Sequence, residues 1–200
     1  MSSLPHAEAR SILQDAWTQL TGSAPSEREL SFVQSIALME TGYGRIGQFE
    51  KFAANGQYNW GALEAARLPD GSCKAGMVPG IDSGKQVCFL AFDSDVKAAK
   101  AYLWNLISNP YMAARTAATR AALATGDALA VATAMKTSLG WYTTSIEAYR
   151  DMIVNGLKAI GAAPPAARPA SAGFPWAYAA LGIGGAAGAF WALKRFGGKK

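Results

Sequence analysis

The sequence predicts a mainly helical domain of the α+β class with one small β-hairpin lobe, followed by a C-terminal transmembrane helix. Three observations lead to this prediction. Apolar residues recur at helical spacing over most of residues 1–160, one stretch rich in Gly and Pro interrupts that pattern, and a long uncharged run lies near the C-terminus. Half of the 200 residues are apolar, so residues 1–160 can bury the core of one domain of ordinary size.

Two helices are predicted in the first part of the chain. The first covers Ala7–Leu20, where apolar side chains recur three and four positions apart. The second begins after Ser26, because Ser26 and Glu29 have the spacing of a capping box, which satisfies two free N–H groups at a helix start. It ends before Gly42, because glycine readily takes the left-handed conformation that terminates a helix.

The stretch Tyr58–Phe92 has a different composition. It holds several Gly, Pro and Asp residues and short β-prone pieces such as QVCFLAF, so we expect a small hairpin lobe there. Thr144 and Glu147 have capping-box spacing before the last helix. After the lobe, one helix is predicted to begin at about Ser94. Three more are predicted to cover Ala113–Thr125, Asp127–Leu139 and Ile146–Ala159.

The C-terminal part is predicted to be a lipid membrane anchor. Residues 161–175 are rich in Pro and Ala and form a semi-extended linker. The next 18 residues, 176–193, carry no charge, and as a helix they would be about 27 Å long, close to the thickness of a hydrocarbon core. Gly184 and Gly188 have the GxxxG spacing that allows close helix contact, so this helix is a candidate for self-association.

The basic tail, residues 194–200, predicts the orientation of this anchor. Basic residues favour the cytoplasmic side of a membrane, so the helical domain is expected on the non-cytoplasmic side. The first residues, MSSLPHAEAR, lack the basic start and apolar run of a secretory signal. Anchoring in a virion membrane that fuses with a host envelope, as in phage entry, would place the domain there without such a signal.

The net charge of +5 belongs to the tail rather than to the domain. Five of the 19 basic residues lie at or after Arg168, so residues 1–160 hold 14 basic side chains and all 14 acidic ones. A nucleic-acid-binding domain is expected to carry a basic face of its own. The charge distribution therefore argues against a nucleic-acid partner.

The two cysteines, Cys73 and Cys88, enclose a segment rich in Gly and Pro. They would form a disulfide if the domain works outside the cytoplasm. Otherwise they would remain reduced, half-buried thiols. The sequence leaves both states open.

Several kinds of catalytic site are excluded because the sequence contains only one histidine. His6 lies in an N-terminal segment that is expected to be mobile, so a His-rich zinc site, a Cys-His pair or a Ser-His-Asp triad cannot readily form. A Gly-rich phosphate loop followed by Lys-Ser/Thr is also missing from the sequence. No metal and no cofactor are therefore expected, and carboxylates and tyrosines remain for acid–base chemistry.

Glu40 is the carboxylate with the most unusual predicted surroundings. It shares a helix face with Val33, Ile36 and Ala37, so burial disfavours its charged form. It also lies in the last helical turn, where the negative end of the helix dipole favours the neutral acid. An acid that stays protonated near neutral pH is suited to protonating a glycosidic oxygen. The alternative is a solvated glutamate at a helix end.

Four segments in sequence order carry a family resemblance: IALMETGYGR, QYNWGAL, FLAFDS and GWYTTSIEAY. Together they resemble the lysozyme-like superfamily, most closely the glucosaminidase branch of bacterial autolysins and flagellar hydrolases. That family has a helix ending in Glu and a Gly-rich turn, an Asn-x-x-Gly segment, an aromatic strand ending in Asp-Ser, and a Tyr-Ala-Thr-Asp-like turn before a Tyr-containing helix. The resemblance covers about residues 30–157. It implies a lysozyme-like fold and cleavage of the glycan strands of peptidoglycan.

The resemblance also implies roles for individual residues. Glu40 would be the general acid, and Asp93 and Ser94 would close the small lobe and cap the next helix. This chain has Thr143-Thr144-Ser145 where the family continues Ala-Thr-Asp. A role for an acidic residue in this turn is therefore not expected to carry over. The substrate-binding residues would be Tyr58, Asn59, Trp60, Gly61, Trp141 and Tyr142. The aromatic members of this set could equally be ordinary packing residues.

The sequence leaves the mechanism open between two alternatives. A hydrolase needs a second carboxylate, for which Glu64 and Asp82 are candidates without a matching motif. A lytic transglycosylase needs Glu40 alone, because a hydroxyl of the substrate attacks. Two other functions also remain: a non-catalytic, membrane-anchored wall-binding or structural virion protein of the same fold, and a membrane conduit built by the C-terminal helix.

Overall fold

The computed structural model describes residues 4–65, 67–82, 84–139 and 145–162. Within these ranges, no helix is both long enough and apolar enough to cross a membrane. Most of the predicted linker at 161–175, the predicted anchor at 176–193 and the tail at 194–200 lie outside the described residues, as do Trp141 and Tyr142.

The described chain is mainly helical, as predicted, and the predicted hairpin lobe is a small antiparallel sheet of three strands. The helices predicted from Ala113 to Thr125 and from Ile146 to Ala159 have these bounds in the structure. The α-helices are α1 (His6–Thr21), α2 (Glu27–Thr41), α3 (Phe49–Ala54), α4 (Asp95–Leu103), α5 (Ala113–Thr125), α6 (Ala128–Thr133) and α7 (Ile146–Ala159). Two π-helical segments, η1 (Trp104–Ser108) and η3 (Ala134–Leu139), continue α4 and α6, and a 3-10 turn, η2 (Pro110–Met112), precedes α5.

The ends of α2 follow from its sequence. Ser26 accepts a hydrogen bond from the Glu29 N–H, and the Glu29 carboxylate accepts one from the Ser26 N–H at 2.8 Å, so the predicted capping box is confirmed. At the other end, Gly42 has φ 56° and donates its N–H to the Leu38 carbonyl at 2.8 Å. Both ends of α2 are therefore fixed by local hydrogen bonds, and Glu40 lies in the last turn before Gly42.

One local prediction was confirmed in part and two were wrong. Ser94 is the N-cap of α4, as expected, whereas Asp93 does not cap the helix and forms an exposed ion pair with Lys97 at 2.7 Å. The N-cap of α7 is Ser145, one residue later than the predicted Thr144, which lies outside the described residues. His6 is not a loose terminal residue: it begins α1, and its Nδ1 lies 3.1 Å from the Tyr43 hydroxyl.

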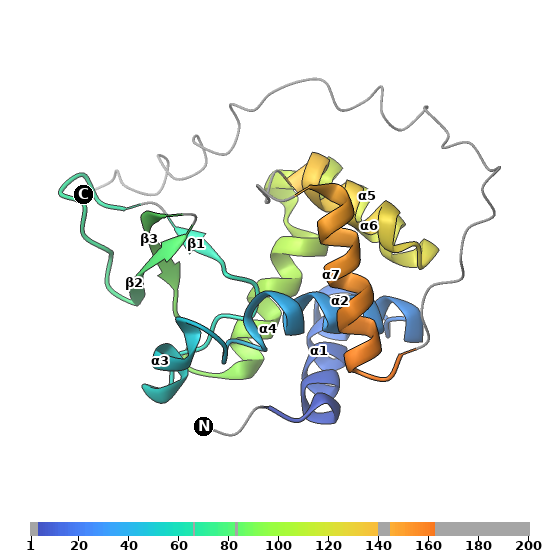
Figure 1. Ribbon diagram of the computed structural model, residues 1–200, viewed down its shortest axis with the longest axis horizontal. Coiled ribbons are helices and arrows are strands. Elements are labelled where there is room, and N and C mark those ends of the chain that lie inside the picture. Colours follow the sequence, from blue (N-terminus) through green and yellow to red (C-terminus); the bar gives the residue numbers. More distant parts are fainter. Residues whose placement is uncertain (1–3, 66, 83, 140–144, 163–200) are drawn as a thin grey trace.

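The helical core forms around α2, which packs against α1, α5 and α7 (Figure 1). Its buried side chains include Val33 and Ile36, which contribute to one large hydrophobic cluster with Trp17 of α1 and Tyr102 of α4. Burial of these large side chains is the main favourable contribution to folding of this part.

The β-lobe, which we define as the strands with their connecting loops, lies with α3 at one side of the molecule in Figure 1. The strands are β1 (Glu64–Ala65), β2 (Met77–Asp82) and β3 (Lys85–Leu90), in the order β1-β3-β2. Phe49 and Phe52 of α3 pack on Phe89 of β3 in a second, smaller core. A disulfide joins Cys73 to Cys88, which decides between the two states that the sequence left open.

Candidate functional site

Glu40 is a half-buried residue whose carboxyl group faces the protein interior. The Tyr149 hydroxyl of α7 donates a 2.6 Å hydrogen bond to its Oε1. Burial raises the pKa of the Glu40 carboxyl to about 8, and the hydrogen bond from Tyr149 opposes this rise. In the described part of the chain no basic side chain forms an ion pair with it. Glu40 is therefore a neutral carboxylic acid at pH 7.

The hydrogen bond from Tyr149 also determines where the acid carries its proton. Because Oε1 accepts the phenolic hydrogen, the proton of the neutral Glu40 belongs on Oε2. That oxygen is buried and has no hydrogen-bond partner among the described residues. A buried polar atom without a partner is rare in folded proteins and marks a place where an acceptor can be expected.

Close packing of α7 on α2 brings Tyr149 to Glu40. The Ser35 hydroxyl of α2 donates to the Ile153 carbonyl of α7 at 2.6 Å. A Cβ atom at Gly156 would come within 2.4 Å of the Ser35 Oγ and 2.8 Å of the Met39 Cγ. Gly156 thus allows the close helix contact on which the Tyr149–Glu40 hydrogen bond depends.

Tyr149 is the site residue that the sequence reasoning missed. It occurs in the segment IEAY, within one of the four family-like motifs, so the Tyr-containing helix was noted. Its contact with Glu40 joins residues 109 positions apart, and no local pattern reports such a contact. The motif order was the only signal that could have identified it.

The turn after Glu40 packs against the segment that leads into the β-lobe. The Thr41 hydroxyl donates to the Trp60 carbonyl at 2.9 Å and accepts the Gly44 N–H at 2.9 Å. Gly44 has φ 74°, and a Cβ atom there would lie 3.0 Å from the Asn59 backbone nitrogen. The close approach therefore depends on the hydroxyl of Thr41 and on the absence of a side chain at Gly44.

Asn59 and Trp60 are internal residues, so the sugar contacts expected of them are not supported. Both are 0% exposed. The Asn59 amide donates to the Leu63 and Leu90 carbonyls at 3.0 and 2.9 Å, and its oxygen accepts the Leu63 N–H at 2.8 Å. Gly61 is likewise buried, and a Cβ atom on it would lie 2.5 Å from the Tyr102 ring. These residues position the lobe rather than form the surface of a groove.

A network of charged side chains also holds the turn after α2 in place. The sequence did not predict this network. Arg45 forms a two-bond ion pair with Asp95 at 2.8 and 2.7 Å. Asp95 also accepts the Trp60 indole N–H at 2.8 Å. The Arg45 guanidinium lies 4.9 Å from the centroid of the half-buried Tyr58 ring. Of the predicted sugar-binding residues within the described chain, Tyr58 alone has a partly exposed side chain.

The two candidates for a second carboxylate interact with each other. Burial is the largest of three causes that raise the pKa of the Glu64 carboxyl. The other two are the charge of the neighbouring Asp82 carboxylate and a hydrogen bond with it. Both residues are exposed, on β1 and β2. Neither is among the described groups that change the pKa of Glu40. The structure therefore gives no support for a Glu40–Glu64 or Glu40–Asp82 catalytic pair.

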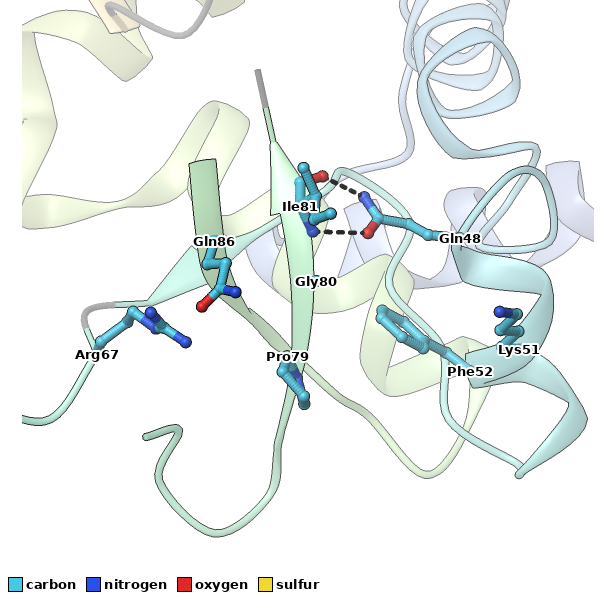
Figure 2. Close-up of a pocket in the computed structure, with 8 residues that line it drawn as sticks. All are labelled: Gln48, Lys51, Phe52, Arg67, Pro79, Gly80, Ile81 and Gln86. Carbon is cyan, nitrogen blue, oxygen red and sulfur yellow. Dashed lines mark hydrogen bonds between the residues drawn. The ribbon is translucent and has the colours of Figure 1, made fainter. Parts of the chain in front are cut away.

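A shallow pocket of about 650 Å³ lies between α3 and the β-lobe, and Glu40 does not line it. Figure 2 shows its residues on both sides of strand β2. They are Gln48, Lys51, Phe52, Arg67, Pro79, Gly80, Ile81 and Gln86. The sequence did not predict this pocket.

Comparison with protein-family models, with curated proteins and with solved structures gave no match.

Proposed function

We propose that the chain is a membrane-anchored enzyme of lysozyme-like fold that cleaves the glycan strands of peptidoglycan, with Glu40 as its general acid. The observation that carries this proposal is the state of the Glu40 carboxyl. Its pKa is about 8, Tyr149 holds its Oε1, and its Oε2 has no partner within the described residues. An acid in this state can protonate the oxygen of a leaving sugar at neutral pH.

Oε2 is buried in the structure, so the proposed reaction requires that side chains over Glu40 move aside when the glycan binds. Oε2 then gives its proton to the glycosidic oxygen as the bond to the sugar carbon breaks. The hydrogen bond from Tyr149 to Oε1 strengthens as Glu40 becomes a carboxylate, because a charged acceptor forms the stronger bond. Since Glu64 and Asp82 interact with each other, we favour the single-carboxylate route. A hydroxyl of the same sugar then attacks the sugar carbon, and the Glu40 carboxylate accepts the proton of that hydroxyl.

Analysis of the cleavage products tests this proposal. Incubation of the full-length chain with purified peptidoglycan should release fragments with anhydro ends, as detected by mass spectrometry. Reducing ends would show that water is the attacking group and that a hydrolase mechanism applies. Intact glycan strands after prolonged incubation at pH 5–7 would contradict the proposed activity.

A second function is favoured by a specific observation. Glu40 does not line the pocket between α3 and the β-lobe, and Asn59 and Trp60 have no exposed surface. A non-catalytic wall-binding or structural protein of the same fold would have these features. It would sediment with peptidoglycan and release no fragments from it.

The membrane anchor is proposed from the uncharged run at 176–193. The full-length chain should remain in the membrane fraction after washing at high pH and should require detergent for release. A chain that ends at residue 162 should be released without detergent. If both chains behave alike, residues 176–193 are not the anchor.

Cross-linking in detergent, with and without Gly184 and Gly188, tests the proposed self-association of this helix.

A further inference from the structure

The pocket between α3 and the β-lobe has two walls of different origin. One wall comes from α3 and its N-cap residue, Gln48. Lys51 and Phe52 follow Gln48 by three and four positions and so lie on the same side of the helix. The other comes from the far side of β2, where Ile81 is paired with Gln86 and where Arg67 lies nearby (Figure 2). A volume of about 650 Å³ is within the usual range of sites for small organic ligands.

A pair of hydrogen bonds holds the α3 wall against β2. The Gln48 amide donates to the Ile81 carbonyl at 2.9 Å, and its oxygen accepts the Ile81 N–H at 3.1 Å (Figure 2). This side chain therefore occupies the main-chain groups that an added strand would use. Pro79, also on this edge strand, has no N–H to donate. A ligand in this pocket must be recognised through side chains rather than by extension of the sheet.

The side chains that are available for recognition are basic, amide and apolar. Lys51 and Arg67 are exposed, and neither forms an ion pair in the part of the chain that the structure describes. Ile81 is 62% exposed, and Phe52 and Pro79 add apolar surface. Asp82 follows Ile81 but does not line the pocket. The complementary ligand is a molecule with two separated anionic groups and some apolar surface.

The C-terminal part of the chain is not such a ligand. Residues 163–200 contain five basic and no acidic side chains. A nucleic acid also fits poorly, because residues 1–160 carry equal numbers of basic and acidic side chains. A short peptide with two carboxylates fits the charges, the apolar surface and the volume.

We propose that this pocket binds the acidic peptide stems of peptidoglycan, with Lys51 and Arg67 each pairing with a carboxylate. This inference rests on the proposed function, because it names the part of the same substrate that is held beside the cleaved glycan. The turn 42–48 directly connects the helix that carries Glu40 to α3. Binding of the stem would thus hold a glycan strand on the lobe next to the end of α2.

Binding of a synthetic stem tripeptide to the full-length chain in detergent tests the inference. The tripeptide contains a D-glutamyl residue and a free C-terminal carboxylate, and a second version has both carboxylates amidated. We expect the acidic form to bind about tenfold more tightly than the amidated one, and added salt to weaken it. The variant with Lys51→Gln and Arg67→Gln should lose about tenfold in affinity. Equal binding of the two tripeptides, or no binding of either, would overturn the inference.

A matched control separates this site from a general effect of charge. Lys74 and Lys85 are also exposed on the β-lobe but do not line the pocket. The variant with Lys74→Gln and Lys85→Gln changes the net charge by the same amount and should bind the acidic tripeptide as the wild-type does. An equal loss in both double variants would show that the pocket is not the binding site.

Cleavage assays distinguish failure of this inference from failure of the proposed function. With peptide-bearing strands as substrate, Lys51→Gln and Arg67→Gln together should raise KM several-fold and leave kcat nearly unchanged. With glycan strands from which the peptides have been removed, wild-type and variant should have the same rates. If the variant slows both substrates equally, the stem is not what the pocket binds. If wild-type cleaves neither, the proposed enzyme activity fails, and the tripeptide measurements still decide the binding site.

Discussion

Replacing Glu40 with glutamine is expected to abolish the release of peptidoglycan fragments while the protein remains folded. Glutamine has nearly the same shape and can still accept the Tyr149 hydrogen bond, but it carries no transferable proton. General acid catalysis typically contributes a factor of about 10² to 10⁴ to the rate. Since Glu40 would act both as acid and as base, we expect the loss to reach at least the upper part of that range.

The matched control for this experiment is Glu50→Gln. Glu50 is an exposed residue of α3. Its replacement should leave clearing of peptidoglycan in a gel assay unchanged. A Glu40→Gln protein that still clears peptidoglycan as fast as wild-type would remove Glu40 from the reaction.

The same substitution is expected to change how stability depends on pH. The native-state pKa of Glu40 is about 8, whereas the ordinary value is 4.5. Below pH 4.5 both native and unfolded states are protonated, and the stabilising contribution is fully present. Between these two values the unfolded state ionises while the native state stays neutral, so the contribution decreases as pH rises and is lost above the native pKa. The unfolding free energy of wild-type should therefore fall by up to about 1.4 kcal/mol per pH unit in this window.

Denaturant unfolding from pH 5 to pH 9 measures this effect. The difference in unfolding free energy between Glu40→Gln and wild-type should shift in favour of the variant as pH increases, by a few kcal/mol over the range. Titration of other groups is common to both proteins and largely cancels in the difference. A difference that does not change with pH would mean that Glu40 has an ordinary pKa in the native state.

The helices could be predicted from sequence because their signals are local. The bounds of α5 and α7 follow from apolar spacing and turn residues, and those of α2 follow from Ser26, Glu29 and Gly42. A capping box or a terminal glycine involves residues within one turn, so one stretch of sequence contains all the information. The β-lobe was predicted by composition, but its strand order and register depend on pairing across loops.

The candidate site was predicted only in part, because most of its contacts join residues that are far apart in the sequence. The environment of Glu40 followed from the apolar face of its own helix, whereas its partner Tyr149 comes from the end of the domain. Asn59 and Trp60 are predicted by motif to be near Glu40, but a motif does not tell a buried supporting residue from a ligand contact. Arg45 and Asp95, 50 positions apart, pair through the fold alone.

The most direct test of the account is a measurement of the Glu40 pKa in the native, full-length chain. Glutamate labelled with ¹³C at the side-chain carboxyl gives one resonance per residue, and the resonance missing in Glu40→Gln identifies Glu40. The account predicts that this resonance titrates with a midpoint near pH 8. A midpoint near the ordinary value of 4.5 would show that the carboxyl is charged at neutral pH and would contradict its role as an acid.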